Sequence, residues 1–137
     1  MNIHNLDADL RVLAEKKNVL GQLDYANEAY DRVEEELHQL EDKFQENYGV
    51  YMEEVFSDIH DQYCPDNDVL LPIAYLANNY IIKDNNVDVG LSEGVLVEVE
   101  DFPDQKARLV LVPSPTRIFL QIDGQDRQEV WKLDPGD

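Results

Sequence analysis

The first half of the chain repeats its apolar residues at the three- and four-residue spacing of an amphipathic helix. One series begins at Leu6 and ends at Leu20. A second series alternates steps of three and four residues: Leu23, Ala26, Tyr30, Val33, Leu37, Leu40 and Phe44. A heptad stripe of this kind is typical of a helix that packs along another helix. Residues 5–63 are therefore predicted to form an acidic amphipathic helical segment.

The two apolar series are out of phase by one residue, and the slip falls at Gly21. One residue is about 100° of helical rotation, so a straight helix would present its apolar stripe on two sides. Either one long helix contacts different neighbours, or the chain breaks into a helical hairpin. Gly21 is a suitable end for the first helix, and Asp24 is a suitable cap for the next. An unbroken helix over 6–47 would be about 60 Å long, whereas a compact domain of this size spans about 35–40 Å.

Shorter helices are expected after this segment. Gly49 is predicted to end or bend the long helix, after which residues 50–63 again place apolar side chains every four residues. After a turn, a short helix is predicted over 68–83, capped by Asp68 and with Pro72 in its first turn. Its buried stripe would consist of Ile73, Leu76, Ala77 and Tyr80.

Beyond Val87 the apolar residues alternate, and residues 94–134 are predicted to form a four-stranded antiparallel meander. The expected strands are 95–100, 108–112, 117–122 and 128–133. The two middle strands are apolar on both faces and should lie centrally, while Asp123-Gly124 gives the best hairpin signal. The chain is thus predicted to be one α+β domain, 1–137, with a helical N-terminal half, an antiparallel sheet, and helices over one face of that sheet.

Charge excludes two classes of partner. The 137 residues hold 30 acids and 11 bases, a net charge of −19, with −13 over residues 1–68 and −6 over residues 69–137. Nucleic acids and anionic membranes carry the same sign, so neither is expected to bind. No apolar run approaches the roughly 20 residues of a membrane helix, and residues 1–10 lack the pattern of a signal peptide. The expected location is the cytoplasm.

The candidate chemical groups do not combine into a site. Glu35 and His38 have the Glu-x-x-His spacing of carboxylate-bridged metal bundles, but the second copy that such bundles need is absent from the sequence. His60 and Cys64 are four residues apart, yet nearby acids would raise the pKa of the thiol. Residues 66–68 resemble the start of a calcium loop without its glycine and closing glutamate. We therefore expect no catalytic residue, no metal site and no cofactor.

The heptad stripe is then the strongest functional signal in the sequence. We expect a non-enzymatic interaction or adaptor module whose stripe forms a homodimer or docks a helix of a partner protein. Several tyrosines coincide with the apolar stripes, which core packing explains most simply, but tyrosine is also enriched at contact surfaces because it combines apolar area with a polar tip. The candidate partner-binding residues are Leu23, Tyr30, Val33, Leu37, Leu40 and Phe44.

Three other functions are compatible with the sequence. The acidic helices suit an inhibitor that imitates nucleic acid and occupies the basic groove of another protein. The size and charge are also similar to those of small acidic secretion chaperones, although those proteins interleave helices between strands. An enzyme or small-molecule-binding protein that uses Glu98 and Glu100 of the sheet is the least favoured, because only fold analogy supports it.

Overall fold

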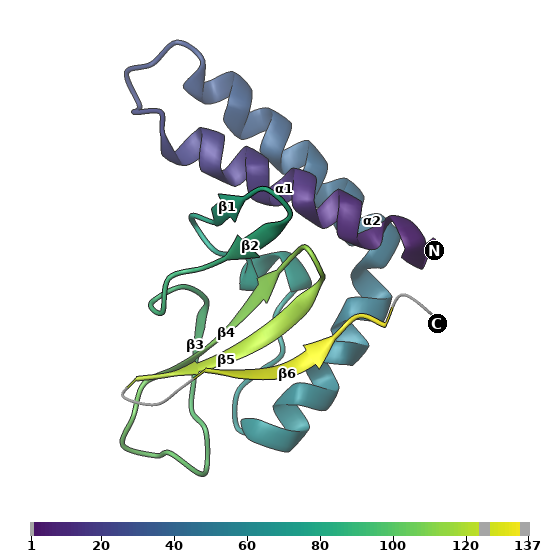
Figure 1. Ribbon diagram of the computed structural model, residues 1–137, viewed down its shortest axis with the longest axis vertical. Coiled ribbons are helices and arrows are strands. Elements are labelled where there is room, and N and C mark those ends of the chain that lie inside the picture. The colour runs from purple at the N-terminus through teal and green to yellow at the C-terminus, as the bar shows by residue number, and fades with distance from the viewer. Residues whose placement is uncertain (1, 124–126, 135–137) are drawn as a thin grey trace.

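The computed structural model describes residues 2–123 and 127–134, and its N-terminal half is a helical hairpin (Figure 1). A short 3-10 helix, η1 (Ile3–Asn5), leads into α1 (Leu6–Gly21), which is followed by the 34-residue α2 (Tyr30–Tyr63). The two helices lie side by side and antiparallel, and their connected end projects past the sheet. Of the two arrangements that the sequence allowed, the hairpin is the correct one.

The break falls where the two apolar series slip. α1 ends at Gly21, and the Gln22 N–H closes its last turn. Asp24 does not cap α2, contrary to the prediction, because its carboxylate accepts the Ala26 N–H at 3.0 Å within the connecting loop. α2 begins only at Tyr30.

Gly49 was predicted to end or bend the helix; the end is wrong, because α2 continues to Tyr63, although Figure 1 shows α2 changing direction partway along its length. A glycine inside a helix costs about 1 kcal/mol relative to alanine. The neighbouring side chains Tyr48, Met52 and Phe56 are all buried. Burying a large apolar side chain contributes about 1.5–3 kcal/mol, so the packing of these residues outweighs the preference of the glycine.

The C-terminal half contains the predicted meander, in the order β3-β4-β5-β6 with every pair antiparallel. The strands are β3 (Val95–Val97), β4 (Ala107–Val112), β5 (Arg117–Ile122) and β6 (Gln128–Lys132). As predicted, β4 and β5 are the central pair, and almost all of their side chains are buried. The predicted Asp123-Gly124 turn is not tested, because Gly124 lies outside the described residues. The α+β class is confirmed.

The short helix predicted over 68–83 is wrong except for one turn. Within this range only η2 (Pro72–Tyr75) is helical. The last residues of the predicted helix instead form strand β1 (Ile81–Lys83). This strand pairs with β2 (Asn86–Asp88) in a separate two-stranded hairpin. A β-hairpin therefore lies next to the sheet where a helix was expected.

Contacts with β4 explain why this segment does not form a longer helix. Leu76 makes a parallel bridge with Leu111, beyond the part of β4 that pairs with β3. The Ala77 N–H donates to Tyr80 Oη at 2.9 Å, and Tyr80 Oη donates to the Leu111 carbonyl oxygen at 2.8 Å. These bonds engage a backbone N–H that a helix would use for its own ladder.

The sheet is covered on both faces rather than on one, which corrects the single-layer expectation. On one face, residues of β4 and β5 such as Leu109 and Ile118 join a core with the two helices and η2. On the other face, a second cluster contains residues from α1, β2, β4 and β5: Ala14, Ala77, Tyr80, Val87, Val89, Val110, Val112 and Phe119. This double cover explains why β4 and β5 are apolar on both sides.

Candidate functional site

Half of the predicted contact stripe is buried inside the chain itself. Val33, Leu37 and Phe44 have relative exposures of only 5%, 5% and 2%. Leu37 and Phe44 belong to the same core cluster as Leu10 and Leu13 of α1. α1 therefore packs on the stripe where the sequence alone suggested a helix from another molecule.

Leu40, the next residue of the stripe, is half-buried in a groove of about 520 Å³. Most of the residues that line this groove are charged: Lys16, Glu36, Gln39, Leu40, Asp42, Lys43 and Glu46. Lys16 and Glu36 form an ion pair of 2.6 Å there, and the hydrogen bond from Lys16 lowers the pKa of Glu36. A groove whose opposite charges already pair with one another is a typical solvated surface.

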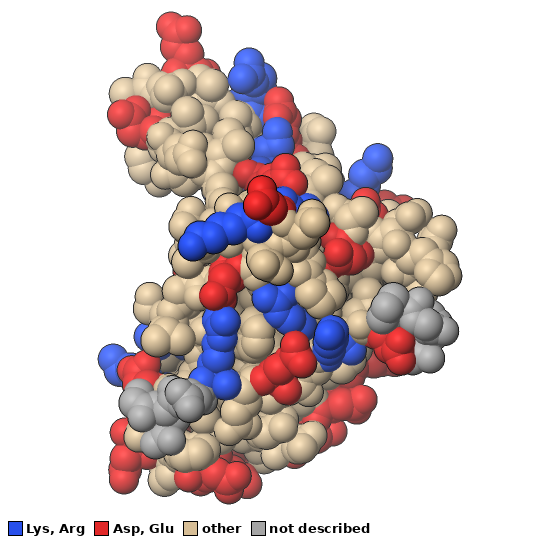
Figure 2. Space-filling model, viewed as in Figure 1, with Lys and Arg blue, Asp and Glu red and all other residues tan. Residues whose placement is uncertain are grey.

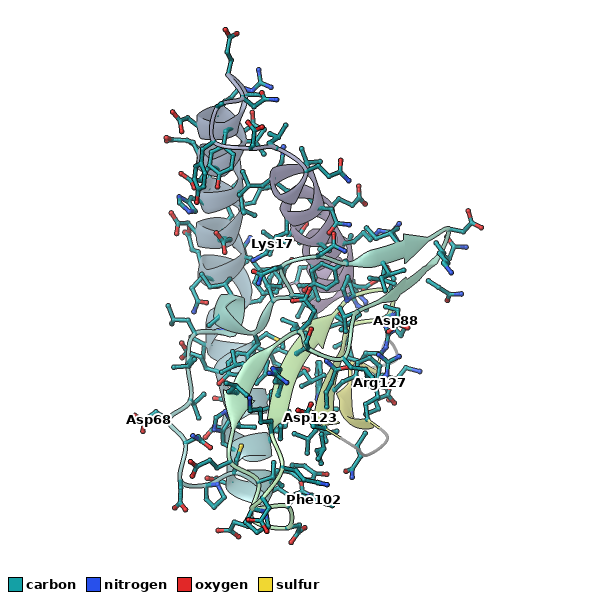
Figure 3. The ribbon with its side chains drawn as sticks, turned by 90° about the vertical axis from the view of Figure 1, so that its left-hand side faces the viewer. Lys17, Asp68, Asp88, Phe102, Asp123 and Arg127 are labelled. Atoms are coloured by element: carbon teal, nitrogen blue, oxygen red, sulfur yellow. The ribbon has the colours of Figure 1, made fainter. Side chains whose placement is uncertain are left out.

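Leu23 and Tyr30 lie in the connected end of the hairpin, which we call the hairpin tip (residues 18–30). They line a groove of about 420 Å³, the tip groove, which also involves α1, the start of α2 and the segment before β1. Its lining residues are Lys17, Leu20, Gly21, Leu23, Asp24, Tyr25, Tyr30, Leu37 and Asn78. Figure 3 shows Lys17 where the hairpin leaves the body of the molecule.

Tyr25 is the most exposed of the large hydrophobic side chains described, at 87%. Its ring centroid lies 4.7 Å from that of Tyr30, and a hydrogen bond with the Tyr25 side chain raises the pKa of Tyr30. The sequence analysis explained tyrosines on the apolar stripes by core packing and did not single out Tyr25. Its position in the loop, one residue off the stripe, was the available signal that it faces solvent.

The hairpin tip carries little charge. Residues 18–30 contain two acids, Asp24 and Glu28, and no base, in a chain whose residues are 30% charged. Figure 2 shows the tip as a largely uncharged lobe, while acids and bases are scattered over the rest of that face. An exposed tyrosine beside an apolar groove on a weakly charged protrusion has the composition of a protein contact surface.

A second exposed apolar segment, Val69–Leu71, lies after α2, with relative exposures of 38–51%. Val69 and Leu70 line a smaller groove of about 320 Å³ together with Glu53 and Ser57. The segment is less exposed than Tyr25, and Asp66 and Asp68 precede it in the chain.

The His60–Cys64 pair is a structural element. His60 is buried, and its ring nitrogens lie 3.0 Å from the Asn67 carbonyl oxygen and 2.9 Å from Tyr75 Oη. Cys64 is fully buried, and burial raises the pKa of its thiol to about 11. A nucleophilic cysteine needs the opposite shift, toward the thiolate.

The remaining acidic candidates are also accounted for by the fold. Asn67 in the acidic turn accepts the Glu98 N–H at 2.7 Å and thereby holds the loop against the chain that follows β3. Glu35, His38 and Glu100 are exposed. Within residues 2–123 and 127–134, no group of three or more histidine, cysteine or acidic residues is placed to hold a metal ion.

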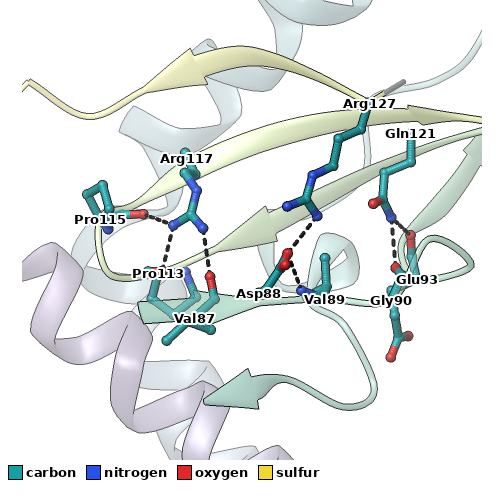
Figure 4. A network of polar contacts seen from close by, with 10 residues as sticks. All are labelled: Val87, Asp88, Val89, Gly90, Glu93, Pro113, Pro115, Arg117, Gln121 and Arg127. Carbon is teal, nitrogen blue, oxygen red and sulfur yellow. Dashed lines mark hydrogen bonds and ion pairs between the residues drawn. The ribbon is translucent and has the colours of Figure 1, made fainter. Parts of the chain in front are cut away.

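A polar network that the sequence analysis missed attaches the β1–β2 hairpin to the sheet (Figure 4). Arg127 forms an ion pair of 2.6 Å with Asp88, and its hydrogen bond lowers the pKa of that carboxyl. Arg117 donates to the carbonyl oxygens of Val87 and of two prolines in the β4–β5 turn. Both guanidinium groups lie over the Phe119 ring, at 4.3 and 5.0 Å from its centroid. The alternation of Arg117 and Phe119 along β5 was a sequence signal for this network.

Comparison with protein-family models, curated proteins and solved structures gives no match to this chain. Neither helix described is long and apolar enough to span a membrane. Function must therefore be inferred from the surface of this molecule alone.

Proposed function

We propose that this protein is a non-enzymatic interaction module that binds another protein chain through its hairpin tip. The observation that carries the proposal is Tyr25, which is 87% exposed beside an apolar groove of about 420 Å³. An aromatic side chain next to a concave apolar surface is the usual composition of an interface hot spot.

This proposal keeps the interaction role expected from the heptad stripe but moves the contact surface. The buried part of the stripe, Val33, Leu37 and Phe44, holds the hairpin together. Leu23 and Tyr30 remain available in the tip groove, where Tyr25 extends the surface they provide. The stripe thus holds the two helices of the hairpin together, and the end of that hairpin makes the contact.

A binding role is favoured over a catalytic one by the state of the candidate reactive groups. The Cys64 thiol is buried with its pKa raised to about 11. Both ring nitrogens of His60 are engaged in hydrogen bonds. The tip groove itself is lined by one lysine and one aspartate, with the other seven residues uncharged. We also propose a cytoplasmic location, which imaging of the tagged chain in its native cells tests.

The acidic-mimic function is the second candidate. Its support is α2, a helix about 50 Å long at 1.5 Å per residue, whose exposed residues include Asp31, Glu35, Asp42 and Glu46. Binding of this kind would depend on charge and weaken steeply with salt. Binding at the tip groove, most of whose lining residues are uncharged, would persist in high salt, so salt separates the two functions.

The test is capture of partners by the tagged chain from nuclease-treated lysate of its native host. The wild type is compared with Tyr25→Ala, Leu23→Asp and the control Val50→Ala, whose residue is 77% exposed on α2. We expect a protein that withstands a high-salt wash, is retained by the control and is lost from both tip variants. Equal capture by all four chains overturns the tip as the contact surface, and capture that disappears in salt favours the acidic mimic.

A further inference from the structure

The outer edge of β3 is a second surface suited to another chain, separate from the hairpin tip of the proposed function. We infer that this edge binds a short extended segment of another protein, rich in lysine or arginine, which adds a strand beside Leu96. Three features support this: the direction of the Leu96 backbone groups, a groove beside them, and the charge around both.

The register of the sheet determines which backbone groups of β4 point toward β3. Opposite residues of an antiparallel pair alternate between those that exchange hydrogen bonds and those that do not. The Asp123 N–H donates to the Lys106 carbonyl oxygen at 2.9 Å, which places this pair among the bonded ones. Every second residue from Lys106 thus bonds toward β5, and the residues between them, such as Ala107 and Leu109, bond toward β3.

Leu96 consequently turns its backbone N–H and carbonyl oxygen away from β4. Its neighbours Val95 and Val97 are the residues that pair with Leu109 and Ala107. Among the residues that the structure describes, no strand other than β4 pairs with β3. The Leu96 side chain is also 58% exposed. A strand edge with free backbone groups is a template onto which an extended chain adds as a further strand.

The chain itself covers the continuation of this edge. The Glu98 N–H donates to Asn67 Oδ1 at 2.7 Å, and the Glu100 N–H donates to the Tyr63 carbonyl oxygen at 3.4 Å. Both donors belong to the same alternate set as Leu96, which agrees with its outward direction. The open part of the edge is therefore limited to β3 itself, and the occupant is a short segment rather than a long strand.

A groove of about 370 Å³ lies beside the open edge. Its lining includes Leu96, Pro103 and the acids Glu98 and Asp104. Gln105 lines it as well, and its Oε1 is buried without a hydrogen-bond donor among the residues described. Rotation of this amide would present the oxygen to an N–H or ammonium group of the occupant. The groove thus has room for a side chain of the added strand and offers acceptors to a basic one.

The charge around the groove selects a basic occupant. Residues 63–68 and 96–106 hold six acids and one base, a net charge of −5 in 17 residues. This is about twice the charge per residue of the whole chain, which carries −19 in 137 residues. All six acids are exposed, and none forms an ion pair with a residue that the structure describes. Figure 3 shows Asp68 and Phe102, one from each segment, at the end of the molecule away from the hairpin tip.

Two alternatives to this contact are less favourable. A second copy of the chain would place its own β3 acids against these six, at a cost in Coulomb energy. The opposite edge of the sheet, β6, carries Lys132 and has an irregular register opposite Ile118 and Phe119. A lysine and a bulge are features that hinder strand addition. A basic segment at β3 meets neither obstacle.

Titration of the isotope-labelled full chain with a capped hexapeptide of alternating lysine and valine, followed by NMR, tests the inference. We expect the amide signals of residues 95–97 and 104–106 to shift and the Leu96 N–H to exchange more slowly with solvent. The same peptide with methylated backbone nitrogens keeps its charge but cannot donate to the edge, and should bind about tenfold more weakly. A peptide of alternating glutamate and valine should not bind.

Variants of the chain separate the backbone contact from the charge. Leu96→Pro removes the outward N–H and leaves the bonds to β4, because proline is tolerated where an edge N–H faces solvent. It should weaken binding of the lysine–valine peptide about tenfold, whereas Leu91→Ala, at an exposed residue outside the groove, should not. Asp104→Asn should weaken binding at low salt, unlike the matched change Glu35→Gln on α2. Circular dichroism verifies that each variant is folded.

Absence of binding at millimolar peptide overturns the inference, as do signal shifts that leave Leu96 unaffected. Equal binding of the methylated peptide also overturns it, because charge alone would then explain the attraction, and this comparison stands even if Leu96→Pro unfolds. Tyr25→Ala should bind the peptide as the wild type does, so failure at β3 leaves the proposed contact at the hairpin tip untouched. In the lysate experiment, a salt-sensitive partner that Leu96→Pro loses is bound at β3 rather than along α2.

Discussion

Tyr48 of α2 donates a hydrogen bond of 2.6 Å from its Oη to Oδ2 of Asp9 on α1, and this bond joins the two helices beside the core. Tyr48 is buried, and its burial, together with the bond to Asp9, raises the pKa of the phenol to about 12. The folded chain therefore holds this proton more tightly than the unfolded chain, in which tyrosine titrates near 10.

The raised pKa of Tyr48 predicts that the folded chain loses stability at high pH. The contribution of Tyr48 is complete below about pH 10 and declines as the pH rises toward 12, because ionised Tyr48 would face the Asp9 carboxylate. Tyr48→Phe should lower the free energy of unfolding by about 1–2 kcal/mol at neutral pH and show a shallower decline in base, measured by urea titration. Equal slopes for wild type and variant would contradict this assignment.

Cys64 should resist thiol reagents in the folded chain. The thiolate is the reactive form, and burial raises the pKa of this thiol to about 11. We expect labelling by an aromatic disulfide to be much slower in buffer than in urea, measured by absorbance, with glutathione as the reagent control. Equal rates in buffer and urea would mean that the thiol is accessible.

We expect the Tyr75 hydroxyl to contribute more to the free energy of unfolding than a hydroxyl with a single hydrogen bond. Nδ1 of His60 faces a carbonyl oxygen, so it carries the ring proton, and Nε2 accepts from Tyr75 Oη. Tyr75 Oη also accepts the Leu70 N–H at 3.0 Å. Tyr75→Phe leaves both groups without a partner and should cost about 2–3 kcal/mol in urea unfolding.

Tyr63→Phe is the matched control for this change. Tyr63 is half-buried at the end of α2, and its hydroxyl takes part in no hydrogen bond with the residues described. Its replacement should alter the unfolding free energy by less than about 0.5 kcal/mol. A loss for Tyr75→Phe no larger than this would show that the His60 network adds nothing to stability.

Replacement of Leu37 tests whether the heptad stripe packs within the chain or against another molecule. Leu37 is 5% exposed and packs in the cluster that contains Leu10 and Leu13 of α1. Leu37→Ala should therefore lower the free energy of unfolding by about 2–4 kcal/mol, independently of protein concentration. Val50→Ala, at a site that is 77% exposed, should change it by less than about 0.5 kcal/mol. Loss of stability only on dilution would indicate a stripe that binds another molecule.

The elements with a strong local period could be predicted from the sequence. The one-residue slip at Gly21 located the end of α1, and residues apolar on both faces identified β4 and β5 as central strands. What the period could not reveal is the identity of the neighbour. The stripe through Leu37 and Phe44 has the same sequence whether α1 or another molecule covers it, because that choice depends on contacts between distant parts of the chain.

The region 68–83 shows the opposite failure, in which a correct apolar period led to the wrong element. The spacing of the apolar residues is helical at Ile73, Leu76, Ala77 and Tyr80. However, the Tyr80 hydroxyl donates a hydrogen bond to a carbonyl oxygen of β4, and the backbone there does not continue as a helix. The β1–β2 hairpin did carry a local signal. Asp84 adopts a positive φ of 52° in its turn, a conformation that aspartate tolerates. That signal was read as the end of a helix.

α1 contributes to both layers of the interior. Leu6, Leu10 and Leu13 belong to the cluster on the α2 side of the sheet, whereas Ala14 belongs to the cluster on the β1–β2 side. If α1 detached, both layers would be exposed to water at once. We therefore expect the chain to unfold as one cooperative unit, so that slow hydrogen exchange in its central strands reports the same opening free energy as exchange in α1.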